Sequence, residues 1–240
     1  MKFLKDLSVK GKKILCRVDI NSPLQAGKIK DDSRIRSILP TIKYLLKEGA
    51  RQVILLAHQG RDKKLAPENR LDQHAIILEK LLREKVLKLD TTRPDNIPQQ
   101  ARLVMLENVR LDDEDSHEKG KRESYAAHLS KLGDIYVNDA FAASHRDHAS
   151  IASLPKLMKE KAAGLLLEKE ISALQPLVQG KIQKPLTIIM GGAKIDTKIG
   201  VLKYFSQGVD HVLVGGGTAN TFLFAEGYDI GQSLCEEDKM

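Results

Sequence analysis

The chain of 240 residues contains no tryptophan, and aromatic residues make up only 4% of it. This composition leaves few rings on which the bases of single-stranded nucleic acid could stack. No segment approaches the roughly 18 consecutive apolar residues that a membrane-spanning helix needs, and no apolar stretch with a cleavage site opens the sequence. We therefore expect a soluble cytoplasmic protein that binds neither nucleic acid nor a membrane.

Cysteine is also scarce. Cys16 and Cys235 stand far apart without a neighbouring cluster of cysteine or histidine, which argues against a disulfide framework and against a zinc site. Like charges are not grouped into blocks, but lysine and arginine (39) outnumber aspartate and glutamate (32), which gives a net charge of +7. This excess favours an anionic partner: nucleic acid, a membrane surface or a small anion. The composition disfavours the first two.

Short apolar runs alternate with amphipathic stretches along the whole chain. This order is typical of βαβ units and predicts an α/β fold with a doubly wound, Rossmann-like parallel sheet. The predicted strands are Lys13–Val18, Gln52–Ala57, Lys85–Leu89, Leu103–Leu106, Asp134–Val137, Leu186–Met190 and His211–Val214. The predicted helices are Ser33–Glu48, Leu71–Glu84, Lys121–Lys131, Leu165–Gln179, Thr197–Gln207 and Thr218–Glu226.

A domain boundary is expected around Gln179–Pro185, where glycine and proline separate a long helical stretch from a new strand. The expected division is an α/β domain over residues 1–164, a connecting helix and hinge over 165–184, and a second α/β domain over 185–240. The last part holds only two βα units, and a buried type of parallel strand left at an open edge is unfavourable. We therefore expect the second domain to be incomplete and the chain to be truncated.

Arginines stand beside polar residues or glycine directly after several predicted strands. Because the carboxyl ends of parallel strands meet at one edge of a sheet, these segments are expected to lie together. Guanidinium groups bind carboxylate and phosphate through paired hydrogen bonds, so the pattern predicts a site for a small, highly anionic molecule. The segments are Arg17–Pro23, His58–Arg61, Glu107–Arg110 and Asn138–Arg146.

Structural explanations remain open for several of these residues. Asp19 and Asn21 could form a turn by bonding to their own backbone, or they could grip the hydroxyl groups of a substrate. Arg17 could form an ion pair with Asp19. A lone histidine such as His58 is more often structural than catalytic. The acidic run Asp112–Asp115 lacks the spacing and the glycine of an EF-hand loop, and we interpret it as solvated surface charge.

Arg34 and Arg36 stand in the first turn of a predicted helix. Positive charge is unfavourable there unless an anion binds at the helix N-terminus. We expect Arg36 on a solvated face and take Arg34 as a candidate ligand of the anion.

Two glycine-rich turns follow the last two predicted strands. In the first, Gly191-Gly192-Ala193-Lys194 opens a helix, so backbone N–H groups and the positive end of the helix dipole are available to phosphate. Lys194 and Lys198 lie one turn apart on the same helix face. The second turn contains Gly215-Gly216-Gly217. Tight strand-to-helix turns often need glycine for packing alone, but two such turns with paired lysines favour a nucleotide polyphosphate.

These motifs, in this order, resemble those of the phosphoglycerate kinase family from about Phe3 to the end of the chain. The similarity implies two doubly wound α/β domains, the first binding 3-phosphoglycerate or 1,3-bisphosphoglycerate and the second binding ADP or ATP with Mg²⁺. The matching segments are Arg17–Pro23, Tyr136–Phe141 with His145-Arg146, Gly191–Lys194 with Lys198, and Gly215–Gly217 with Ala219–Phe222.

The resemblance also implies roles for individual residues. Arg34 and Lys194 are the expected catalytic residues, with Arg34 nearest the transferring phosphoryl group. The expected substrate-binding residues are Asp19, Asn21, Arg34, His58, Arg61, Arg110 and Arg146. The expected nucleotide-binding residues are Lys194, Lys198, Gly215, Gly216 and Gly217.

Departures from the family pattern are few: Gln59 replaces a usual leucine, Asp62 a common proline, and Thr218 stands where an apolar residue often follows the glycines. The segment of the family that supplies the Mg²⁺-binding aspartate is absent, so no metal ligand is assigned. We expect a monomeric fragment of the kinase with little activity alone. The alternative is a non-catalytic protein that binds 3-phosphoglycerate or a similar anion.

Overall fold

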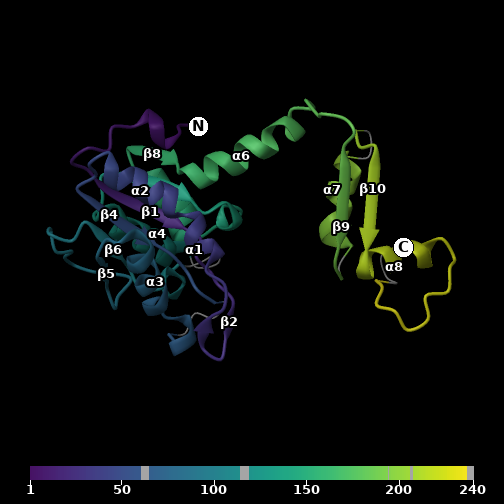
Figure 1. Ribbon diagram of the computed structural model, residues 1–240, viewed down its shortest axis with the longest axis horizontal. Helices are drawn as coiled ribbons and strands as arrows, with labels where there is room; N and C mark the ends of the chain where they lie inside the picture. Colours follow the sequence, from purple (N-terminus) through teal and green to yellow (C-terminus); the bar gives the residue numbers. More distant parts are fainter. Residues whose placement is uncertain (61–64, 114–118, 194, 206–207, 237–240) are drawn as a thin grey trace. The chain divides into compact units, whose positions relative to one another are not determined.

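The computed structural model describes residues 1–60, 65–113, 119–193, 195–205 and 208–236. The chain divides into two compact units, Met1–Ile171 (unit 1) and Ser172–Met240 (unit 2), each described here by itself (Figure 1). The division falls inside helix α6 (Leu165–Val178), in the segment expected to connect two domains. Within the described ranges, no helix has both the length and the apolarity needed to cross a membrane.

Unit 1 is built on a six-stranded parallel sheet in the order β5-β6-β4-β1-β7-β8, which confirms the predicted α/β class. Its central strands β1 and β4 are buried on both faces, and this explains why they are mostly apolar instead of alternating between apolar and polar residues. The strands are β1 (Lys13–Val18), β4 (Gln52–Leu56), β5 (Val86–Lys88), β6 (Leu103–Met105), β7 (Ile135–Asp139) and β8 (Glu160–Ala163).

Helices cover both faces of this sheet. On one face, alternate strand residues such as Cys16 and Leu55 pack against α1, α2 and α3. On the other face, Leu15, Ile54 and their neighbours pack against α4 and α5. The helices are α1 (Ser33–Ser37), α2 (Leu39–Lys47), α3 (Asp72–Leu82), α4 (Lys119–Ser130) and α5 (Leu154–Leu157).

The second of these cores contains two fully enclosed tyrosines. Tyr136 of β7 donates a hydrogen bond to the carbonyl of Ser150 at 2.7 Å, and Tyr125 of α4 donates one to the carbonyl of Thr92 at 3.3 Å. Burial raises the pKa of both phenols well above the ordinary value. Both side chains are therefore neutral, hydrogen-bonded parts of the core.

Unit 1 differs from the sequence prediction in several features. The expected helix Ser33–Glu48 is broken at Ile38, because Pro40 has no N–H to continue the ladder; α2 begins at Leu39, with Pro40 in its first turn. Strand β8 was not predicted, because it contains none of the β-branched or aromatic residues that favour strands. A short hairpin pairs β2 (Leu24–Gln25) with β3 (Lys28–Ile29) through a turn in which Ala26 and Gly27 both have positive φ.

Unit 2 contains a two-stranded parallel sheet of β9 (Thr187–Gly191) and β10 (His211–Gly215), in register from the first pair to the last. Each strand leads into a helix: β9 into α7 (Asp196–Phe205) and β10 into α8 (Gly216–Ala225). Several apolar side chains of this sheet are exposed, including Ile189 and Leu213. The two βα units predicted for this region are confirmed.

Candidate functional site

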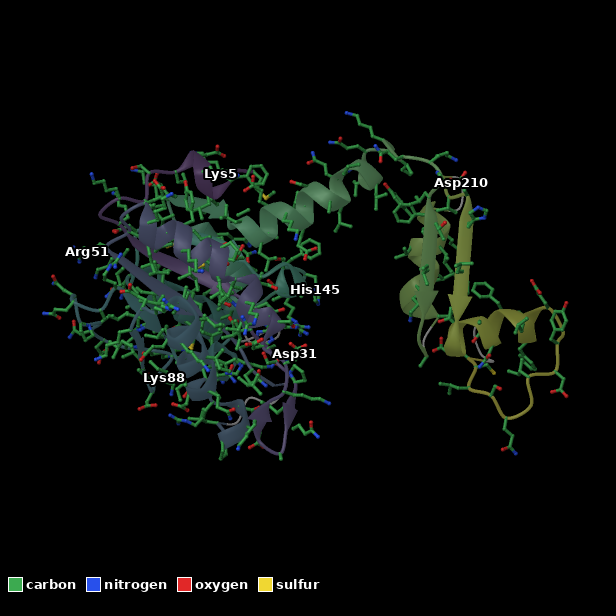
Figure 2. The ribbon with its side chains drawn as sticks, in the orientation of Figure 1. Lys5, Asp31, Arg51, Lys88, His145 and Asp210 are labelled. Atoms are coloured by element: carbon green, nitrogen blue, oxygen red, sulfur yellow. The ribbon has the colours of Figure 1, made fainter. Side chains whose placement is uncertain are left out.

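The polar segments predicted to converge do lie at one edge of unit 1. Because β1, β4, β6 and β7 are all parallel, their carboxyl ends share that edge, and the loops with Asp19, His58, Arg110 and Arg146 follow those ends. We call this set of loops the anion edge. Figure 2 shows the labelled Asp31 and His145 on this side of unit 1, with Arg51, which precedes β4, on the other side.

Asp19 and Asn21 are held by a local hydrogen-bond network. The Asp19 carboxylate accepts the Asn21 backbone N–H at 3.2 Å through Oδ1 and pairs with Arg34 Nη1 at 2.7 Å through Oδ2. The side-chain oxygen of Asn21 accepts the Gly60 N–H at 2.9 Å. The turn-forming explanation is therefore correct for Asp19, which also pairs with the half-exposed Arg34, whereas the Asn21 side chain bonds to the loop after β4 and not to its own backbone.

Gln59, which stands where the family usually has leucine, connects two loops through its side chain. Its side-chain amide accepts the Ser22 N–H at 2.9 Å and donates to the Ser22 carbonyl at 2.9 Å. The Asn108 side chain in turn donates to the carbonyls of Gln59 and Asn69, both at 2.8 Å. These buried pairs fasten the loops after β1, β4 and β6 to one another. Sequence reasoning missed Asn108 as a connector, although it stands in the recognised segment Glu107–Arg110.

Arg17 is not an exposed anion ligand, and the alternative that it forms an ion pair with Asp19 is also wrong. Its side chain is only 1% exposed. Its Nε donates to Ser150 Oγ at 3.1 Å, its Nη1 to the Val18 carbonyl at 2.5 Å, and its Nη2 lies 3.0 Å from His58 Nδ1. The Asp19 carboxylate is instead paired with Arg34, which approaches from α1.

The interpretation of Asp112–Asp115 as surface charge is wrong for Asp113. This carboxylate is 3% exposed and accepts the N–H of Ser150 at 2.7 Å and its hydroxyl at 2.6 Å. Hydrogen bonds and nearby positive charge lower its pKa against the opposing effect of burial, so it stays ionised. Asp112 forms an ion pair with Arg93 at 2.8 Å. Residues 114 and 115 lie outside the described ranges.

His58 is enclosed and surrounded by positive charge. Its pKa falls from 6.5 to about 3, first because the ring is buried. The charges of Arg17, Arg110 and Arg146 lower the pKa further, while Asp113 opposes them. Arg17 lies 3.0 Å from the ring, and the charges of Arg110 and Arg146 also act on it, so all three guanidinium groups add positive potential at His58. Such a field attracts a small polyanion.

Cavities near this edge are small and open. A hollow of about 210 Å³ lies beside the Asp19–Arg34 pair and extends to Asp139, Phe141 and Glu170. A larger hollow, of about 930 Å³, lies between α3 and β5, where acidic and basic side chains alternate. Its mixed charge shows no preference for an anion, so the anion edge remains the candidate site of unit 1.

Among the other predicted ligands, Arg146 is exposed and Arg110 is half-buried on the short turn Val109–Leu111. Arg61 and Lys194 lie outside the described residues.

In unit 2 the two glycine-rich turns contact each other directly. The Gly192 carbonyl accepts the N–H of Thr218 at 2.9 Å and its hydroxyl at 3.0 Å. A Cβ placed on Gly217 would approach the Ala193 backbone at 3.2 Å, and Gly216 has a φ of +62°, which glycine adopts without strain. Thr218, an atypical residue in the motif comparison, therefore links the two turns.

Lys198 lies over this junction. A Cβ placed on Gly192 would approach Lys198 Nζ at 3.0 Å, so the ammonium group lies against the glycine turn. Glu236 also contacts this region: its carboxylate accepts the N–H of Ile195, the residue directly before α7. The Glu236 carboxylate thus takes up one backbone N–H at the N-terminus of α7, where the helix dipole favours negative charge. Nothing in the local sequence around Glu236 indicated this contact.

Comparison with known proteins identifies the class to which this fold and site belong. The family model of phosphoglycerate kinase matches residues 4–240. Curated relatives include the phosphoglycerate kinases of Moorella thermoacetica, 45% identical over 99% of this chain, and of Dictyoglomus turgidum, 43% identical over 99%. The chain belongs to the phosphoglycerate kinase family.

Solved structures agree with this result. The phosphoglycerate kinase of Coxiella burnetii is similar with a TM-score of 0.81 and 37% identity over 98% of this chain. That of Pyrococcus horikoshii gives 0.84 and 32% over 96%. The chain spans 61% and 60% of the length of the two curated relatives, and 59% of each of the two solved chains.

Proposed function

We propose that this chain serves the reaction of its family, the reversible phosphoryl transfer between 1,3-bisphosphoglycerate and ADP that yields 3-phosphoglycerate and ATP in glycolysis. The observation that carries the proposal is the anion edge, where the charges of several arginines act on one buried histidine and the Asp19–Arg34 pair lies on the same edge of the sheet. Carboxylate and phosphate on one small molecule match such an arrangement.

In this proposal unit 1 binds 3-phosphoglycerate. Asp19 and Asn21 hold the glycerate part, and Arg34 lies nearest the phosphoryl group that is transferred. A basic patch of His58, Arg61, Arg110 and Arg146 binds the carboxylate and the other phosphate.

Unit 2 contributes to nucleotide binding. Lys198 and the glycine turns Gly191-Gly192 and Gly215–Gly217 offer an ammonium group and backbone N–H groups, which suit phosphate oxygens. Lys194 is assigned to the phosphoryl group in transfer. These donors do not suit a metal ion, and the described residues include no group of three potential metal-binding side chains. Mg²⁺ enters this proposal bound with the nucleotide, and no residue of this chain is assigned as its ligand.

The residues present match the chemistry of this reaction. Phosphoryl transfer to a carboxylate requires little covalent participation by protein, and rate enhancement comes from positioning and from neutralising negative charge. Arg34 and Lys194 supply positive charge at the transferring group, while Asp19 holds Arg34 in place at 2.7 Å. We further propose a monomeric, cytoplasmic protein without affinity for nucleic acid, and little turnover from these 240 residues alone.

The experiment is calorimetric titration of the chain with 3-phosphoglycerate and, separately, with ADP and Mg²⁺. Arg34→Ala should weaken 3-phosphoglycerate binding about tenfold to a hundredfold, the usual effect of losing a charged hydrogen bond. Arg36→Ala is the matched control, because Arg36 stands two residues away and pairs with Asp32 instead. Equal effects of the two substitutions would contradict the site. Binding of 3-phosphoglycerate without ADP would support a non-catalytic binder.

A coupled kinase assay tests the activity itself. We expect a rate far below that of a full-length relative measured in parallel. A comparable rate would contradict the expectation of low turnover while supporting the reaction.

A further inference from the structure

One group at the anion edge has a contact that decides its hydrogen-bonding role. His58 Nδ1 lies 3.0 Å from Arg17 Nη2. A guanidinium group carries only N–H donors and keeps its proton throughout the accessible pH range. The nitrogen that faces it must therefore be the acceptor. His58 accordingly carries its proton on Nε2.

The position of Arg17 is fixed by a directional chain of hydrogen bonds. The hydroxyl of Ser150 has one proton, which it donates to Asp113 Oδ2 at 2.6 Å, and this leaves its lone pairs to accept Arg17 Nε at 3.1 Å. Asp113 also accepts the Ser150 N–H at 2.7 Å. All three side chains are at least nine-tenths buried. The guanidinium therefore cannot turn away from His58 without breaking several buried hydrogen bonds.

The balance of burial and neighbouring charge opposes protonation of the His58 ring. Arg17, Arg110 and Arg146 each act on His58 with a positive charge, while the described carboxylate of Asp113 acts in the opposite direction. An imidazolium would place a second donor against Arg17 and a fourth positive charge in this group. Geometry and charge agree on a neutral ring.

We propose that Arg17 is a positioning residue that locks His58 in the neutral Nε2–H form, so that the anion edge presents an uncharged N–H donor to an oxygen of the bound molecule. The inference rests on the proposed function for the identity of that molecule, 3-phosphoglycerate. The arginines and His58 then have different roles in the site: the arginines supply positive charge, and His58 supplies one hydrogen-bond donor with a fixed orientation. Binding through His58 then does not depend on pH over the range in which free histidine titrates.

The decisive measurement is the imidazole ¹⁵N NMR spectrum of the 240-residue chain, since the two neutral tautomers and the imidazolium differ in their nitrogen shifts. The chain has 7 histidines, and His58→Gln identifies the relevant signals. We expect His58 to show the Nε2–H pattern without titration from about pH 5 to about pH 8. An Nδ1–H pattern, or titration within that range, would overturn the inference.

Two variants test the role of Arg17. Arg17→Gln should allow both tautomers and weaken 3-phosphoglycerate binding about tenfold, the loss of a well-aligned hydrogen bond to a charged ligand. Ser150→Ala removes one hydroxyl and should shift the tautomer balance in the same direction with less effect on folding. Arg51→Gln, at the other end of β4, should change neither signal nor affinity. Wild-type tautomer ratios retained in both Arg17→Gln and Ser150→Ala would overturn the inference.

The affinity should be measured from about pH 6 to about pH 8. The phosphate of the ligand titrates near pH 6 in every experiment, so the ratio of variant to wild-type affinity isolates the protein. We expect this ratio to change with pH for Arg17→Gln and to stay constant for Arg51→Gln. A locked Nε2–H form in a chain that does not bind 3-phosphoglycerate would contradict the proposed function and leave the positioning by Arg17 supported.

Discussion

The N-terminus of α6 should depend strongly on one side chain from β7. Helix α6 begins at Leu165, and its preceding residue is Gly164, which has no side chain to cap it. Asp139 fills this role from a distance: its Oδ1 accepts the N–H groups of Leu166 at 2.9 Å and Leu167 at 3.1 Å. A Cβ on Gly164 would lie 2.2 Å from that oxygen, so the two positions are complementary.

Asp139→Ala should lower the free energy of unfolding of unit 1 by about 2–3 kcal/mol. Two buried backbone donors lose their acceptor, at about 1–1.5 kcal/mol each, which agrees with the upper range for loss of a helix cap. Asp139→Asn keeps an acceptor oxygen and should cost less than about 1 kcal/mol at neutral pH. The comparison separates the hydrogen bonds from the charge.

The pH dependence has a defined sign. Burial raises the pKa of Asp139, so the protonated carboxyl is favoured in the folded state. Its contribution to stability is therefore fully present below the unfolded-state pKa of about 3.9 and is lost as the pH rises through the folded value. The asparagine side chain does not titrate, so its contribution to stability does not fall with rising pH. The free energy of unfolding of the Asp139→Asn variant should therefore rise relative to that of the wild type as the pH increases.

The assay is amide hydrogen exchange of β1 and β4 in a urea series, because these strands report on unit 1 and exclude unit 2. Glu48→Gln, an exposed carboxylate at the end of α2, is the control and should change stability by less than about 0.5 kcal/mol. An Asp139→Ala variant within that same limit would refute the assignment of Asp139 as the cap of α6.

Three further changes give separate tests. Gln59→Leu should destabilise unit 1 by about 2 kcal/mol in the same exchange assay, because both buried hydrogen bonds of its amide are lost; an unchanged stability would contradict this. Gly216→Ala should destabilise α8 by about 1–2 kcal/mol because its φ is positive, whereas Gly200→Ala, which meets no atom within 4 Å, should be neutral or stabilising. Glu236→Gln removes negative charge from the N–H of Ile195 and should tighten ADP binding about twofold to fivefold in calorimetry; weaker binding would argue against competition at this helix end.

Elements whose signal is local could be predicted from the sequence. Strand β1 occupies Lys13–Val18, the same residues as the predicted strand, because a parallel strand covered on both faces is predominantly apolar, here Ile14–Cys16 and Val18. The meeting of the loops after β1, β4, β6 and β7 follows from parallel strands alone. Helix boundaries differ more: the predicted helix Ser33–Glu48 is two helices, α1 and α2, because Pro40 breaks an otherwise regular amphipathic stretch.

The connections inside the site could not be predicted, because they join distant parts of the chain. Asp113 is acidic and stands in an acidic run, so its neighbours indicate solvent; its burial depends on Ser150, 37 residues later. The neighbours of Arg17 in the sequence likewise do not indicate its burial. Its partners are Ser150, 133 residues away, and the Leu56 carbonyl of β4. Buried polar residues are determined by their partners, and a single sequence does not reveal which partners meet.

The enclosed phenols of Tyr125 and Tyr136 provide an optical signal that belongs to unit 1. In a chain without tryptophan, tyrosine dominates the near-ultraviolet absorption, and these two of the five tyrosines ionise only at a pH well above the ordinary value. In a rapid jump to alkaline pH, their ionisation should therefore be delayed until the core opens. The slow part of the absorbance change would time the unfolding of unit 1 without any label.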